Sequence, residues 1–154
     1  MKIVYTIGAV LLVVVIAVVS LAPLGPLPGF FIGGEATEAP AEWQDTSDID
    51  NVLLKVVAPI PRVVTIWIIQ YQGELYVVGY KESGWIKMIG DGGPVKVRIE
   101  DKTYALNAAR LETGWQPMMQ AYIDKYRPDN AELVASFPPV EEAGDQIAVF
   151  HLKR

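Results

Sequence analysis

The sequence predicts an α+β protein that is mainly β: a six-stranded antiparallel β-barrel with one or two covering helices, preceded by a single N-terminal transmembrane helix. Three observations predict this class. Residues 3–22 form an uncharged apolar run. From Asn51 onward, short runs of β-branched and aromatic residues alternate with glycine, proline or acidic turns, as strands do. Between residues 113 and 137, large apolar residues recur at helical spacing.

The first element is the run IVYTIGAVLLVVVIAVVSLA at residues 3–22. As a helix with a rise of about 1.5 Å per residue, this run would span a hydrocarbon core of roughly 30 Å. We therefore predict that residues 1–22 are a membrane anchor. The alternative is a cleaved secretory signal, for which Ser20 and Ala22 offer a pattern of small residues.

The flanks of this run predict its orientation. Lys2 precedes the run, and the first basic residue after it is Lys55. Because basic residues favour the cytoplasmic side, we expect a single-pass membrane protein with a cytoplasmic N-terminus and an extracytoplasmic domain, periplasmic if the cell is Gram-negative.

Residues 23–50 are predicted to be a linker, first rich in proline and glycine and then acidic, with Trp43 as its docking residue. Six of the chain's 18 acidic residues lie in this linker, and Lys2 is the only basic residue before Asn51. The predicted domain at residues 51–154 therefore carries twelve acidic and twelve basic residues. A neutral domain lacks the basic surface that nucleic-acid binding requires, so we expect no nucleic-acid partner.

The domain begins with strands that have two kinds of pattern. The run at 95–100 alternates between apolar and charged residues, which predicts one packed and one solvated face. The run VVTIWIIQY at 63–71 is apolar on both faces, so the sheet must curl or be covered by a helix. The predicted strands are 51–58, 63–71, 74–80, 95–100, 103–111 and 145–152.

The covering helix is predicted after Thr113, which with Gln116 forms a capping-box pattern. Arg127-Pro128 ends this helix, and a second short helix runs through Phe137. The residues that recur along one face of the first helix are Trp115, Met118, Met119, Tyr122 and Tyr126. This spacing favours core packing over a cofactor wall.

Several kinds of chemistry are excluded by composition. The chain has no cysteine and one histidine, His151, which excludes Cys-His catalysis and multi-histidine metal sites. We expect His151 to be structural. The glycine-rich run GDGGP at 90–94 lacks the lysine and hydroxyl residue of a phosphate-binding loop, and we predict that it is a turn.

A basic and aromatic set remains around the third predicted strand. Lysine and serine hold phosphate by charge and hydrogen bonds, and tryptophan offers a flat surface to a ring. The alternative is that the aromatic residues are core and the lysines are solvated. The candidate cofactor-binding residues are Thr65, Trp67, Lys81, Ser83, Trp85 and Lys87.

The order of these features resembles the split β-barrel superfamily, which includes pyridoxamine-phosphate oxidase-like flavin proteins and deazaflavin-dependent nitroreductases. The matching parts are IGGEATEAPAEW at 32–43, VVTIWIIQYQGELYVVG at 63–79, SGWIK at 83–87, VKVRIEDKTYALNAARLE at 95–112 and AYIDKY at 121–126. The resemblance implies that Lys81, Ser83, Trp85 and Lys87 hold the phosphate end of FMN or the deazaflavin F420. It places Thr65 and Trp67 near the ring.

The function that the resemblance implies is a membrane-anchored oxidoreductase, which passes hydride or electrons from the cofactor to a quinone-like or nitroaromatic acceptor. It also implies a homodimer with sites at the interface. The alternative is a cofactor-free accessory subunit or ligand-binding module of a membrane complex.

Overall fold

The computed structural model describes residues 2–21, 23 and 28–154. Ala22, part of the predicted cleavage pattern, and residues 24–27 of the predicted linker lie outside the described residues. The helices are α1 (Lys2–Leu21), α2 (Gly84–Ile89), α3 (Gln116–Tyr126), α4 (Ala131–Ala135) and a 3₁₀ turn at Ala143–Asp145. The strands are β1 (Glu35–Thr37), β2 (Asn51–Val56), β3 (Arg62–Tyr71), β4 (Glu74–Tyr80), β5 (Gly92–Ile99), β6 (Lys102–Arg110) and β7 (Ile147–Lys153).

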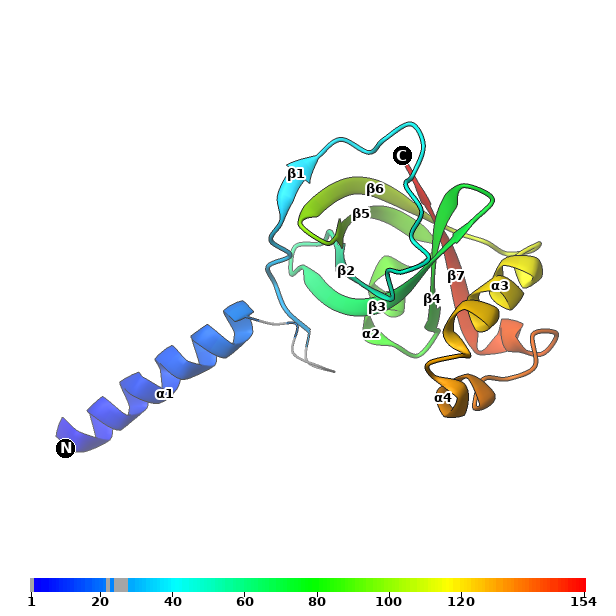
Figure 1. The fold of residues 1–154 in the computed structure, drawn as a ribbon. Helices are drawn as coiled ribbons and strands as arrows, with labels where there is room; N and C mark the ends of the chain where they lie inside the picture. The colour runs from blue at the N-terminus through cyan, green and yellow to red at the C-terminus, as the bar shows by residue number, and fades with distance from the viewer. Residues whose placement is uncertain (1, 22, 24–27) are drawn as a thin grey trace.

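Six of these strands close into an antiparallel barrel in the order β6-β5-β2-β3-β4-β7, with β7 returning to β6 (Figure 1). Strand β6 makes closure possible because one of its edges pairs with β5 and the other edge pairs with both β1 and β7. The parallel strand β1 pairs with residues 102–104, and β7 pairs with residues 107–110. The predicted α+β class with a six-stranded antiparallel barrel is confirmed, and β1 is an addition that the sequence did not predict.

The alternating pattern of β5 produces the predicted inner and outer faces. Val95, Val97 and Ile99 are buried in the barrel core, whereas Lys96 is exposed on the outer face. The doubly apolar strand β3 packs on both sides. Ile68 faces the barrel core, and Ile69 faces a second core beneath α3. The predicted helical cover is therefore confirmed for this strand.

The two ends of the barrel are closed by different segments. Helix α2 buries Trp85, Ile86 and Ile89 in the barrel core near the start of β3. At the opposite end, residues 43–50, which we call the strap, bring the indole of Trp43 against Tyr104, with ring centroids 5.1 Å apart at 89°. The predicted linker thus contains the segment that closes the barrel.

Two local features of residues 80–94 differ from the loop and turn that the sequence suggests. Within SGWIK, residues 84–87 belong to helix α2 and Ser83 is its N-cap, and the helix places Trp85 and Ile86 in the barrel core. The predicted turn at 90–94 is shorter than expected, because β5 already begins at Gly92, which pairs with Ala109 of β6.

The structure also corrects the prediction for the N-terminus. Helix α1 is formed as expected, but none of the helices in the described residues is long and apolar enough to cross a membrane. The predicted transmembrane anchor, single-pass membrane location and extracytoplasmic placement are therefore wrong.

Candidate functional site

Strands β3 and β4 separate along their length, and the predicted site residues lie around this opening. The two strands pair only from Ile68 to Tyr71 of β3. Nearer its start, β3 is bridged at Val63 by Gly29, whereas the end of β4 pairs with β7. Thr65 and Trp67 lie on the part of β3 that does not pair with β4, and the other predicted residues follow the end of β4.

Trp85 belongs to the barrel core and presents no free ring face. Its side chain is buried, and its ring lies 5.9 Å from that of Phe150 at an interplanar angle of 50°. It also fills the space over Gly79, where an added Cβ would lie 2.5 Å from the Trp85 Cζ2 atom. Trp85, one of the two tryptophans among the candidate residues, is thus part of the core.

Trp67 lies on the outer face of β3, where α3 covers it. Its ring stacks on Tyr126 with centroids 4.1 Å apart and an interplanar angle of 5°, and Phe137 meets it at 6.5 Å. Thr65, two residues earlier, is exposed. Of the two β3 residues, only Thr65 has a free side chain.

The predicted lysines and the predicted serine each have a partner within the described chain. Lys81 Nζ donates to the carbonyl oxygen of Gly144 at 2.6 Å, and Ser83 Oγ donates to that of Tyr80 at 2.5 Å. Lys87 forms an exposed ion pair with Glu82, which lowers the pKa of that glutamate. Lys81, Ser83 and Lys87 therefore lie on one segment, but their donor groups bind three different partners and do not face a common ligand position.

Arg62, at the start of β3, is a candidate that the sequence analysis did not select. Its guanidinium lies against Gly84, where an added Cβ would come within 3.2 Å of Arg62 Cζ and 3.3 Å of both terminal nitrogens. The Arg62 Nε atom is buried and has no hydrogen-bond partner among the described residues. A lone arginine after a proline carries no distinctive sequence signal, and only the fold places it beside Ser83 and Gly84.

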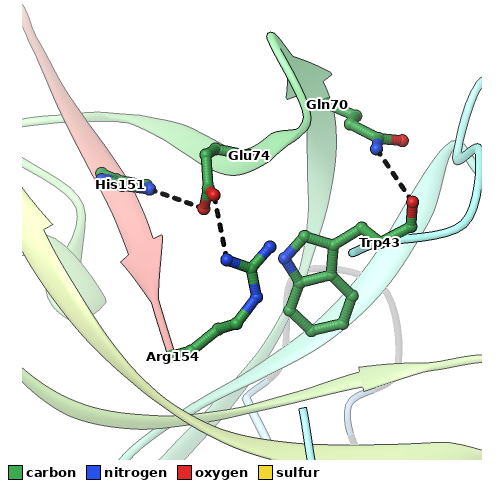
Figure 2. A network of polar contacts seen from close by, with 5 residues as sticks. All are labelled: Trp43, Gln70, Glu74, His151 and Arg154. Atoms are coloured by element: carbon green, nitrogen blue, oxygen red, sulfur yellow. Dashed lines mark hydrogen bonds and ion pairs between the residues drawn. The ribbon is translucent and has the colours of Figure 1, made fainter. Parts of the chain in front are cut away.

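A polar network lies at the other end of β3 and β4 (Figure 2). The carboxylate of Glu74 lies 3.1 Å from His151 Nε2 and accepts from Arg154 Nη1 at 3.0 Å. The guanidinium of Arg154 in turn lies over the ring of Trp43, 5.6 Å from its centroid. His151 therefore helps to hold Glu74 next to the strap, a contact consistent with the structural role expected for it.

The pKa of Glu74 is lowered from its ordinary value, chiefly by the hydrogen bond with His151 and further by Arg154. A carboxyl whose pKa is lower in the folded state stabilises the fold above its unfolded pKa of about 4.3, and this contribution is lost as the pH falls through the folded pKa. We expect Glu74→Gln to unfold at a lower temperature than the natural protein at pH 7, with the difference shrinking between about pH 5 and 3. Thermal unfolding at several pH values measures this.

The matched control is Glu132→Gln, since this helix α4 carboxylate makes no ion pair among the described residues. A gap between Glu74→Gln and the natural protein that stays constant from pH 7 to pH 3 would contradict the assignment.

In the part of the chain that the structure describes, no group of three or more histidine, cysteine, aspartate or glutamate side chains is placed to hold a metal ion.

Comparison with known proteins yields distant structural likenesses. No protein-family model matches the chain, and no curated protein matches it. A nimc/nima family protein from Clostridium acetobutylicum has a TM-score of 0.49 at 16% identity, covering 66% of this chain and 72% of its own. The heme storage protein HutZ from Vibrio cholerae has a TM-score of 0.49 at 15% identity, covering 68% of this chain and 80% of its own. An F420 reductase has a TM-score of 0.39 at 18% identity, covering 67% and 84%. Likenesses at this level assign the chain to no family and carry no argument about its chemistry.

Proposed function

We propose that this chain binds the phosphate end of a flavin or deazaflavin cofactor where β3 and β4 separate, and that it acts as an oxidoreductase on a nitroaromatic or quinone-like acceptor. The observation that carries the proposal is Arg62. Its Nε–H is buried and has no hydrogen-bond partner in the part of the chain that the structure describes, and its guanidinium packs against Gly84, where a side chain would crowd it. A buried donor of this kind requires an acceptor, and a phosphate oxygen supplies one with favourable charge.

The neighbouring residues fit the phosphate better than the ring. Arg62 and Ser83 would hold the phosphate, with Lys81 and Lys87 adding positive charge nearby. The bound cofactor would supply hydride or electron transfer, and the protein would supply binding and orientation. Trp67 is already packed against Tyr126, and Trp85 against Phe150. The cofactor ring would therefore contact Thr65 and not the faces of these two tryptophans. A second copy of the chain, in the homodimer that the resemblance implies, would complete the ring site.

The test is titration of the purified full chain with FMN and with F420, followed by cofactor fluorescence. We expect Arg62→Gln to raise the dissociation constant by about tenfold or more, because it removes a charge-assisted hydrogen bond. The control is Arg127→Gln, an exposed arginine that pairs with Asp124 on α3. Equal affinities for the two variants would contradict the role of Arg62.

A second function is favoured by the same geometry. The rings of Trp67 and Trp85 are covered, and the lysines at 81 and 87 already have partners. These observations suit a cofactor-free barrel that serves as an accessory or ligand-binding module. A natural protein that takes up neither FMN nor F420 would exclude the oxidoreductase and leave this module.

A further inference from the structure

Three carbonyl oxygens surround one ammonium group where the strap meets the barrel. Lys125 Nζ, on helix α3, donates to the backbone oxygens of Thr46 at 2.9 Å, Ile49 at 2.7 Å and Ile68 at 3.1 Å. A primary ammonium carries three N–H donors, so this set of acceptors uses all of them. Two of the oxygens belong to the strap and the third belongs to β3. The acceptors therefore converge on one point between the strap and the barrel.

The number and the distances of these oxygens fit an ammonium better than a metal ion or a guanidinium. Ca²⁺ takes about 6–8 oxygen ligands at about 2.3–2.6 Å, and Mg²⁺ demands octahedral coordination at about 2.0–2.1 Å. The three oxygens lie at 2.7–3.1 Å, too few and too distant for either ion. A guanidinium is planar and carries its donors in a rigid fork, whereas three acceptors around one point match the N–H bonds of a tetrahedral ammonium.

The surroundings of this point favour a positively charged occupant without pairing it directly. The ring centroid of Tyr126 lies 5.1 Å from the ammonium nitrogen, within the range of cation–π attraction. Burial lowers the pKa of this lysine, whereas the charges of Asp50, Asp45 and Asp48 raise it. None of the ion pairs among the described residues involves Lys125. The cation is therefore held by neutral oxygens, with carboxylates at longer range.

Contacts other than those of the lysine also hold the acceptors in place. The Thr46 carbonyl accepts from the Ile49 N–H at 3.1 Å, and the Thr46 N–H donates to Gln70 Oε1 at 3.1 Å. Ile68 lies where β3 pairs with β4. An open groove of about 850 Å³ lies beside the ammonium, lined in part by Thr46, Gln70 and the lysine itself. The set of acceptors therefore remains, with access to solvent, when the lysine side chain is shortened.

We propose that these three carbonyls form a binding site for a primary ammonium group, which the natural chain fills with its own Lys125 and which accepts a free alkylammonium when that side chain is shortened. Occupancy of the site docks the strap, and the docked strap brings Trp43 against Tyr104 at the barrel end. Arg62 lies at the start of β3, near the opposite end, so the inference does not rest on the proposed cofactor.

The experiment uses the full chain with Lys125→Ala and the chloride salts of two cations. Propylammonium supplies the part of the lysine side chain that alanine lacks, whereas tetramethylammonium has the same charge but no N–H donor. Hydrogen exchange at the Thr46 amide follows strap docking. We expect Lys125→Ala to speed this exchange about tenfold or more. Propylammonium at about 0.2 M should slow it again about threefold, as a ligand does at about twice its dissociation constant, and tetramethylammonium should not.

The natural protein is the matched control, because its site is filled and propylammonium should leave its exchange unchanged. Lys125→Arg keeps the charge but presents a planar fork, and we expect its Thr46 amide to exchange faster than in the natural protein. If Lys125→Ala does not fold in buffer, propylammonium should restore the fold where tetramethylammonium does not. Equal effects of the two cations on Lys125→Ala, an equal effect of propylammonium on the natural protein, or full docking in Lys125→Arg would overturn the proposal.

Discussion

Replacing Gly92 with alanine is expected to lower the free energy of unfolding by about 4 kcal/mol. Gly92 begins β5 with φ +143°, a conformation that residues with a side chain rarely adopt. An added Cβ would also lie 2.4 Å from the carbonyl oxygen of Ala108, a backbone atom of β6 that has no room to move within the barrel. Strain and collision therefore add, and urea denaturation followed by tryptophan fluorescence measures their sum.

The neighbouring residue supplies a matched control. Gly93 has nearly the same φ, +147°, but an added Cβ there would meet nothing within 4 Å. Gly93→Ala should therefore show the strain alone, about 1–2 kcal/mol. Equal losses of stability for the two alanine variants would show that the approach of β5 to β6 is not the tight contact described here.

The strands could be predicted from sequence because each carries its own pattern. The alternation of Val95, Val97 and Ile99 specifies a face without any knowledge of the partner strand. Barrel closure could not be predicted in this way, because the pairing of residues 107–110 with β7 depends on a register that no local pattern encodes. The start of β5 at Gly92, earlier than the sequence predicts, has a related reason. Gly92 and Gly93 resemble a turn in sequence, and only the neighbouring strand β6 shows that they extend β5.

The candidate site was less predictable than the fold. Trp85 looked like a ring-binding residue because a tryptophan in a loop has no evident core to enter, yet α2 carries it into the barrel. Arg62 has no distinctive sequence pattern around it, and it is a candidate because its Nε atom is buried without a partner among the described residues and its guanidinium contacts Gly84, 22 positions later. Lys125 is a further example: its sequence context is that of a solvated lysine on a helix, but in the fold its side chain contacts residues 46, 49 and 68. Side-chain partners separated this far along the chain are set by the fold.

The second large effect concerns Lys125, near the end of α3. Its ammonium group donates to three backbone carbonyl oxygens, those of Thr46 at 2.9 Å, Ile49 at 2.7 Å and Ile68 at 3.1 Å. Two of these carbonyls belong to the strap and the third to β3, so one side chain fastens the strap to the barrel. Burial lowers the pKa of Lys125, and the nearby charges of Asp50, Asp45 and Asp48 oppose that change.

Lys125→Met keeps most of the apolar stem but removes all three donors, and we expect it to lower the free energy of unfolding by about 3 kcal/mol. The carbonyls of Thr46 and Ile49 would then lack this donor, whereas that of Ile68 keeps the Tyr126 hydroxyl within 2.7 Å. The loss of stability should therefore be concentrated in the strap. Relative to the natural protein, Lys125→Met should speed hydrogen exchange more at the Thr46 amide than at amides of the strands. Lys87→Met is the control, because an exposed ion pair contributes at most about 1 kcal/mol. If the two variants lose equal stability, Lys125 contributes no more than an exposed lysine does, and the contacts of Trp43 and Gln70 hold the strap without it.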